Sequence, residues 1–126
     1  MNNITLYHYS DKKLNNIEPR YFGANSYTFN DIRASKIKRA FFYIQEAIPE
    51  YRFETSQFLH IAEISGRKIY DLRIDKKGLR QKYQGNIEGL LSYIKRKYDG
   101  AIYNVGFDIA ILFKSVKSKK IIERVL

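Results

Sequence analysis

Short runs of apolar and aromatic residues mark three strands in the first half of the chain. The runs cover residues 4–9 (ITLYHY), 40–44 (AFFYI) and 58–64 (FLHIAEI). β-Branched and aromatic side chains pack well on a pleated surface, and short runs of them between polar residues are typical of strands. The pattern therefore predicts a strand in each of the three segments.

Turn-forming and helix-capping residues fill the gap between the first two of these strands. Glu18 precedes a proline, which keeps its backbone extended. Glycine, asparagine and serine predict a loop over 21–27. Asn30 or Asp31 can cap a short helix, which we expect over 32–38.

The clearest helix of the chain is predicted over 86–98. Apolar residues recur there at steps of three and four, which places them on one helix face. These residues are Ile87, Leu90, Leu91, Ile94 and Tyr98. Basic residues at 95–97 suit the negative end of the helix dipole, and Asp99 with Gly100 ends the helix.

The remaining patterns predict short strands and one helical turn around that helix. We expect strands over 67–72, 101–103 and 107–113, an extended segment over 119–125 and a helical turn over 78–82. Helices are too few for a doubly wound parallel sheet, so the order of elements predicts an α+β fold with a mixed or antiparallel sheet. Neither a repeat nor a linker interrupts the 126 residues, and we expect one domain over 1–126.

The missing cysteines and the shortness of the apolar runs exclude several classes of protein. Without cysteine the chain has no disulfide framework, cysteine-based zinc site or cysteine nucleophile. The apolar run at 109–113 is far shorter than the roughly 20 residues of a membrane-spanning helix. The first residues (MNNI) are not a charged region followed by an apolar stretch, so we expect no secretion signal. We therefore expect no membrane contact and a cytoplasmic location.

A surplus of positive charge bears on the partner. The chain has 23 Lys and Arg against 13 Asp and Glu, a formal net charge of +10. A protein with this much positive charge favours nucleic acid or a ribonucleoprotein as partner. The simpler interpretation is a lysine-rich face that contacts only solvent. Tyr70, Tyr83, Tyr93 and Tyr98 are interleaved with the basic residues, and tyrosine rings can stack on bases.

Two histidines are the main candidates for chemistry. The sequence has no phosphate-binding glycine loop, no His-Glu-x-x-His and no nucleophilic-serine motif. Two histidines are too few for a histidine-rich metal site, and neither has the obvious partner that a toxin-type ribonuclease needs. His8 stands near a strand end, where its ring can bond a ligand in a cleft or stay half-buried in the sheet. His60 lies inside a strand and is interpreted as structural.

An ordered series of short motifs resembles the ADP-ribosyltransferase-like domains of phage and mobile-element proteins. The series runs Leu6–Ser10, Ile17–Pro19, a loop with Gly23, Arg39–Tyr43, Tyr70–Leu72, Tyr98–Tyr103 and Ala110–Phe113. Each motif is short, and the series follows nearly the whole chain in order. The resemblance implies an α+β fold with a split β-sheet that holds NAD in a cleft.

The resemblance also implies roles for individual residues toward NAD. His8 would hydrogen-bond the ribose on the adenosine side, with Tyr9 and Ser10 beside it. Tyr43 would stack on the nicotinamide, with Tyr27 as the second choice.

Asp108 is the carboxylate to which the resemblance points. It would bind the nicotinamide ribose and stabilise the oxocarbenium cation that develops there. It stands where active family members usually carry a glutamate, which is one methylene longer. The alternative interpretation of Asp108 is a turn residue at the start of a strand.

The function that the resemblance implies is that of an effector with NAD as its substrate. It would transfer ADP-ribose to a host or defence macromolecule, either a protein or a nucleic-acid acceptor, in the cytoplasm of the host cell. The alternative is a catalytically inactive binding protein on the same scaffold. Its basic surface would bind nucleic acid or inhibit a nucleic-acid-handling complex, since one fold can host either function.

Overall fold

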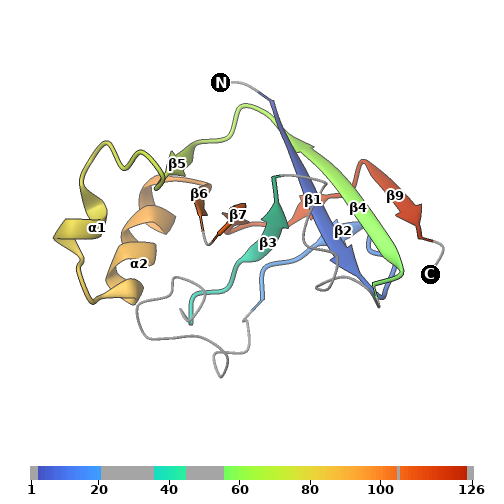
Figure 1. Ribbon diagram of the computed structural model, residues 1–126, viewed down its shortest axis with the longest axis horizontal. Coiled ribbons are helices and arrows are strands. Elements are labelled where there is room, and N and C mark those ends of the chain that lie inside the picture. The colour runs from blue at the N-terminus through green and yellow to red at the C-terminus, as the bar shows by residue number, and fades with distance from the viewer. Residues whose placement is uncertain (1–2, 21–35, 45–55, 105, 125–126) are drawn as a thin grey trace.

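A mixed β-sheet forms the body of the protein (Figure 1). The computed structural model describes residues 3–20, 36–44, 56–104 and 106–124. The strands there are β1 (Ile4–Ser10), β2 (Asn16–Ile17), β3 (Ala40–Tyr43), β4 (Phe58–Ile64), β5 (Ile69–Asp71), β6 (Gly100–Asn104), β7 (Asp108–Leu112), β8 (Val116–Lys117) and β9 (Lys120–Glu123). The helices are α1 (Leu79–Lys82) and α2 (Ile87–Lys97). The architecture is the α+β class that the sequence predicts.

Within the described segments, seven strands make one sheet in the order β5-β6-β7-β3-β1-β4-β9. Only β5 and β6 run parallel in it, and the chain crosses between them through α1 and α2. Parallel neighbours need a long crossover, usually a helix, whereas antiparallel neighbours do not. The short strands β2 and β8 form a separate antiparallel pair. The prediction of a mixed, mostly antiparallel sheet is confirmed.

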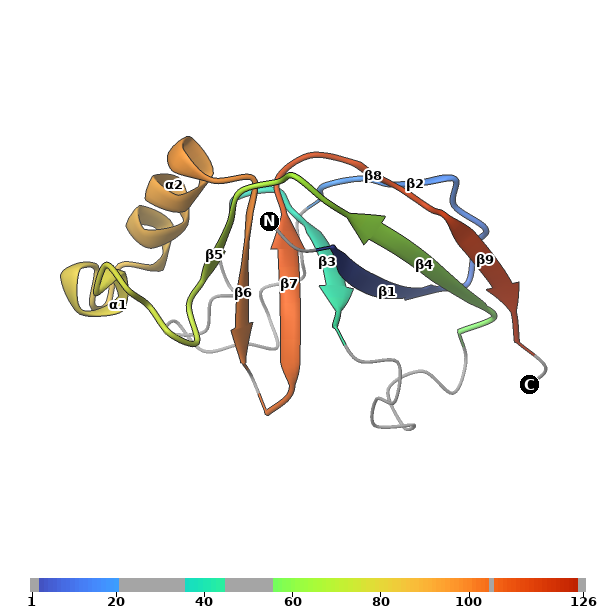
Figure 2. The ribbon, with the colours of Figure 1, turned by 90° about the horizontal axis from the view of Figure 1, so that it is seen from above.

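The sheet divides between β1 and β3. Tyr7 and Tyr43 form the one registered residue pair between these strands, whereas seven pairs join β1 to β4 and four join β3 to β7. Figure 2 shows β1, β4 and β9 running at a steep angle to β5, β6 and β7. Two half-sheets therefore meet along a short seam, and His8 follows Tyr7 at that seam.

Apolar side chains cover both faces of the sheet. On one face, Leu91 and Ile94 of α2 belong to a buried cluster with residues of β6 and β7. On the other, Phe42 and Leu112 cluster with the short β2–β8 pair. A strand buried on both faces carries a continuous apolar run, which explains the sequence of β7.

Most predicted elements are confirmed, with bounds that agree to within about two residues. The helix predicted over 32–38 is wrong in the part that the structure describes. Lys36 to Lys38 are not helical, although the sequence predicts a helix over 32–38. Arg39 exchanges two backbone hydrogen bonds with Arg20, of 3.0 and 3.1 Å, which hold this stretch extended. Residues 32–35 and the loop expected over 21–27 lie outside the described residues. The pair β2–β8 is an addition that the sequence does not predict.

Candidate functional site

His8 holds β1 and β3 together at the seam. Its Nδ1 lies 2.8 Å from the carbonyl oxygen of Phe41, and because a carbonyl only accepts, Nδ1 carries the proton. The ring packs at a tilt on Phe42, with 5.8 Å between ring centroids, and is 7 % exposed. Burial is the main reason that the pKa of His8 falls to about 4. The imidazole is therefore neutral at pH 7, with Nε2 left as an acceptor.

A small cavity opens beside His8. It has a volume of about 130 Å³ and is lined by His8, Leu14, Asn16, Ile17, Glu18, Arg20 and Phe41. In the part of the chain that the structure describes, no hydrogen bond to Nε2 of His8 is found. The positive charge of Arg20 is near enough to lower the pKa of His8 further. The cavity thus offers a neutral acceptor on His8, a cation on Arg20 and a carboxylate on Glu18. His8 and Glu18 suit ligand hydroxyl groups, and Arg20 suits a phosphate.

His60 is structural, as the sequence predicts. The backbone amide of Leu14 donates to its Nε2 at 2.9 Å, and its Nδ1 donates to the carbonyl of His8 at 3.1 Å. Both ring nitrogens are therefore used by the backbone, and the side chain is fully buried. Burial lowers the pKa of His60.

The structure does not bring Tyr43 to His8. Successive side chains of a strand point to opposite faces, and Tyr43 lies with Tyr9 on the face opposite His8, their ring centroids 6.1 Å apart. Phe41 and Phe107 complete this aromatic cluster, with centroids 5.2 and 5.4 Å from that of Tyr43. The hydroxyl oxygen of Ser10 accepts the amide hydrogen of Lys12 at 3.1 Å, which is a turn contact. Tyr27 lies outside the described residues.

Asp108 shares the face of His8, but β3 separates the two. It begins β7 and stands two residues before Ala110, which pairs with Phe42. One carboxylate oxygen accepts from Nη1 of Arg73 at 2.8 Å, and the other accepts from the Asn104 amide at 2.9 Å. The turn interpretation of Asp108 thus has direct support in these contacts.

Arg73 is the residue at this site that sequence reasoning did not single out. It bonds Asp108 and also Asp71, through its Nε and Nη2, both at 2.8–2.9 Å. The partner in β7 is 35 positions away in sequence, so no local motif signals the contact. Arg73 is the main reason that the pKa of Asp71 is lowered.

Replacing Arg73 by glutamine is expected to destabilise the protein modestly. The change leaves the Asp71 and Asp108 carboxylates without their cation. Solvent screens both pairs, however, because the side chains of Arg73, Asp71 and Asp108 are 37 %, 26 % and 25 % exposed. We expect the free energy of unfolding to fall by about 1 kcal/mol at low salt and by less at high salt. Urea denaturation at two salt concentrations measures this. The control Lys119→Gln, which opens a looser 3.4 Å pair with Glu63, should change it less, and an equal loss in both variants would contradict the expectation.

Comparison with known proteins gives no assignment, because no protein-family model, curated protein or solved structure matches the chain. Among the residues described, no three His, Asp or Glu side chains gather where they could hold a metal ion. No helix in the described segments has the length and apolar character to cross a bilayer. What the structure defines is an α+β domain with a divided sheet and a buried neutral histidine at the division.

Proposed function

We propose that the protein is an ADP-ribosyltransferase-like domain that binds NAD where the sheet divides and transfers ADP-ribose to a protein or nucleic-acid acceptor. The observation that carries this proposal is His8, fixed by the Phe41 carbonyl at the seam between β1 and β3. The resemblance implies a split sheet with a histidine toward NAD, and this geometry supports that expectation.

His8 and Arg20 would bind the adenosine side of NAD. A ribose hydroxyl would donate to Nε2 of His8, which stays neutral because the pKa is about 4. Arg20, on the wall of the same cavity, would pair with a phosphate of the dinucleotide. The cavity of about 130 Å³ takes only a part of NAD, so the remainder would extend along the seam.

The transfer itself breaks the bond between C1′ of the nicotinamide ribose and the nicotinamide nitrogen. Nicotinamide leaves with the bonding electron pair, and an acceptor nucleophile attacks C1′ and loses its proton. Asp108 would stabilise the positive charge that develops in between. A carboxylate has about four lone-pair positions, so Asp108 can accept a ribose hydroxyl while it keeps Arg73 and Asn104. This pose leaves Tyr43 without the nicotinamide contact that the resemblance implies, because its ring is buried with Tyr9 and Phe107 on the other face of the sheet.

Labelled NAD incubated with the protein and a cell lysate tests the proposal. Asparagine at position 8 can still donate to the Phe41 carbonyl from the place of Nδ1 but has nothing at the place of Nε2. We expect His8→Asn to fold and to transfer label about tenfold more slowly than wild type, because one ligand hydrogen bond is lost. Arg20→Gln should weaken NAD binding by about tenfold.

The matched control is Lys120→Gln, which removes one exposed positive charge from the edge strand β9, separated from the seam by β4 and β1. It should leave the transfer rate unchanged. If wild-type protein neither consumes NAD nor transfers label, the enzymatic proposal fails and the inactive binding protein becomes the better account. If Lys120→Gln slows transfer as much as His8→Asn does, His8 has no specific part in it.

A further inference from the structure

The elements β5, α1 and α2 lie together at one end of the molecule (Figure 1). Tyrosine rings and exposed lysines from this end form one surface. We infer that it binds single-stranded nucleic acid, with bases on the rings and phosphates on the lysines. This tyrosine–lysine surface is made up of Lys68, Lys77, Lys82, Tyr83, Tyr93, Arg96 and Tyr98. Its residues are distinct from those that line the His8 cavity, so the inference does not depend on NAD binding.

The cations of this surface lie over the tyrosine rings. The ammonium of Lys77 is 5.4 Å from the ring centroid of Tyr98 and 6.0 Å from that of Tyr93. Lys82 is 5.7 Å from both Tyr83 and Tyr93. Lys68 lies over Tyr98 at 5.8 Å and the guanidinium of Arg96 over Tyr93 at 5.9 Å. Rings and cations are thus interleaved at spacings short enough for one nucleotide to touch both.

Nearby carboxylates do not neutralise these cations. Residues 67–98 hold ten Lys and Arg against three Asp and Glu, a net charge of +7 out of the +10 of the whole chain. Asp71 is bound by Arg73, Asp75 accepts from the amides of α1 and from the Tyr70 hydroxyl, and Glu88 accepts from the Lys36 amide. None of the ion pairs found in the described residues involves a lysine of this surface. The lysines are therefore held by tyrosines and not by carboxylates, with Lys77 hydrogen-bonded to Tyr98, and a phosphate can replace that contact.

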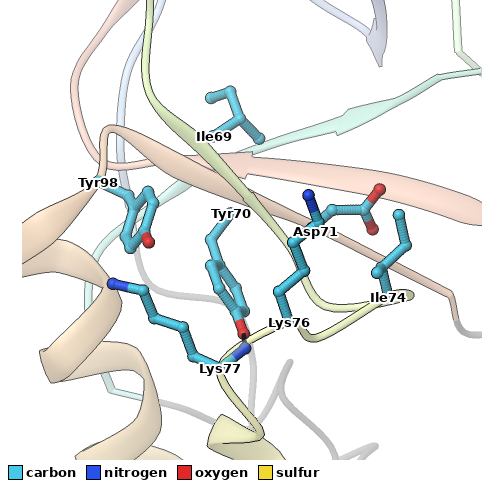
Figure 3. Close-up of a pocket in the computed structure, with 7 residues that line it drawn as sticks. All are labelled: Ile69, Tyr70, Asp71, Ile74, Lys76, Lys77 and Tyr98. Carbon is cyan, nitrogen blue, oxygen red and sulfur yellow. Dashed lines mark hydrogen bonds between the residues drawn. The ribbon is translucent and has the colours of Figure 1, made fainter.

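A cavity of about 340 Å³ adjoins the rings, within the usual range for ligand pockets. Figure 3 shows Tyr98 and Tyr70 on one side of it and Ile74 on the other. The Lys76 side chain stands between Tyr70 and Ile74, and that of Lys77 runs toward Tyr98. Ile74 is the one large apolar side chain in the described residues that is mainly exposed, at 66 %. Flat aromatic and aliphatic walls with cations at the edge suit a nucleobase with its flanking phosphates.

The loop that forms the floor of this cavity is already ordered. The Tyr70 hydroxyl accepts the amide hydrogen of Lys77 at 3.0 Å and bonds the carboxylate of Asp75. The same carboxylate accepts the amides of Leu79 and Arg80, at 2.9 and 3.0 Å, where α1 begins. A preformed site loses little conformational entropy on binding.

Half-exposed rings and a base-sized cavity favour a single strand over a duplex. Bases stacked in a duplex show only their edges, whereas the unstacked bases of a single strand offer their faces to aromatic side chains. A duplex would reach the lysines through its phosphates alone. The rings therefore specify the partner more closely than the charge does.

Fluorescence anisotropy with labelled dT and U oligonucleotides, in the absence of NAD, tests the inference. The double variant Lys77→Gln/Lys82→Gln should bind at least tenfold more weakly than wild type, and the slope of log K against log salt should shrink by about 1.4. The matched control Lys117→Gln/Lys120→Gln removes the same charge from the strands β8 and β9. It should weaken binding less than threefold.

Tyr98→Leu separates stacking from charge. It keeps the net charge and an apolar side chain against Tyr70, and it should weaken oligonucleotide binding about tenfold because one base loses its platform. Circular dichroism checks that the variant is folded. If it is not, Tyr93→Leu tests stacking in its place, because it removes another ring of the same surface. Three results would overturn the inference. They are an equal loss of affinity in the two lysine double variants, unchanged affinity in the tyrosine variants, and binding of a duplex as tight as that of the single strand. Displacement of the oligonucleotide by polyglutamate at equal charge would do so too, in favour of an acidic protein partner.

Discussion

Acidification from pH 7 to pH 4 is expected to remove about 3 kcal/mol of folding free energy through His8 alone. The pKa of His8 is about 4 in the folded protein, against an ordinary value of 6.5. Between these pH values the unfolded chain binds a proton at His8 that the folded protein does not bind. The free energy of unfolding therefore rises with pH. The contribution is fully present above pH 6.5 and is lost as the pH falls toward 4. Burial lowers the pKa of His60 in the same direction and adds to the loss.

Urea denaturation of wild type and His8→Asn over this pH range measures the effect. The asparagine variant does not titrate at position 8, so its free energy of unfolding should fall less steeply with acid. A titration of the His8 ring protons in the wild type gives the pKa directly and does not depend on any variant. Parallel pH profiles for the two proteins, or a His8 pKa near 6.5, would contradict the account.

Gly100→Ala is expected to destabilise the protein by more than about 3 kcal/mol, or to prevent folding. A Cβ at this position would stand 2.2 Å from the carbonyl oxygen of Ile111 and 2.9 Å from Cδ1 of Leu112. The oxygen belongs to the backbone of β7, which pairs with both β6 and β3 and cannot move without disturbing both ladders. Thermal and urea unfolding of the variant measure the loss.

Gly85→Ala is the control for this substitution. Gly85 has a φ of +75° but nothing within 4 Å of its would-be Cβ, so only backbone strain of about 1 kcal/mol is expected. A similar loss in both glycine variants would show that the contact between β6 and β7 is looser than described.

The strands and the main helix follow from local patterns, but the partners of the site residues do not. The apolar periodicity of α2 and the aromatic runs of β1, β3 and β4 are properties of short segments, and these elements are confirmed. From the sequence, Gly100 is interpreted as the end of the helix. In the structure, a glycine is required at this position because the backbone of Ile111 in another strand comes too close for a side chain. No sequence window contains that contact.

The relation between His8 and Tyr43 shows the same limit. Both lie on strands, as the sequence predicts, but which face each one occupies depends on the Tyr7–Tyr43 register at the seam. A shift of one residue reverses every side chain of a strand, so no pattern within either strand fixes the outcome. The Arg73–Asp108 ion pair likewise joins residues 35 positions apart. The interleaving of tyrosines and lysines over 67–98 is visible in the sequence, whereas their gathering on one surface requires α1 and α2 to pack as they do.

Nitrogen NMR of the two imidazole rings during addition of NAD tests the central claim most directly. Without NAD, both rings should show a proton on Nδ1 and none on Nε2 at pH 7, because of the hydrogen bonds they make. NAD at millimolar concentration should shift the Nε2 resonance of His8 and leave both nitrogens of His60 in place. If neither ring responds, or if His60 moves as much as His8, NAD does not bind at the seam between β1 and β3.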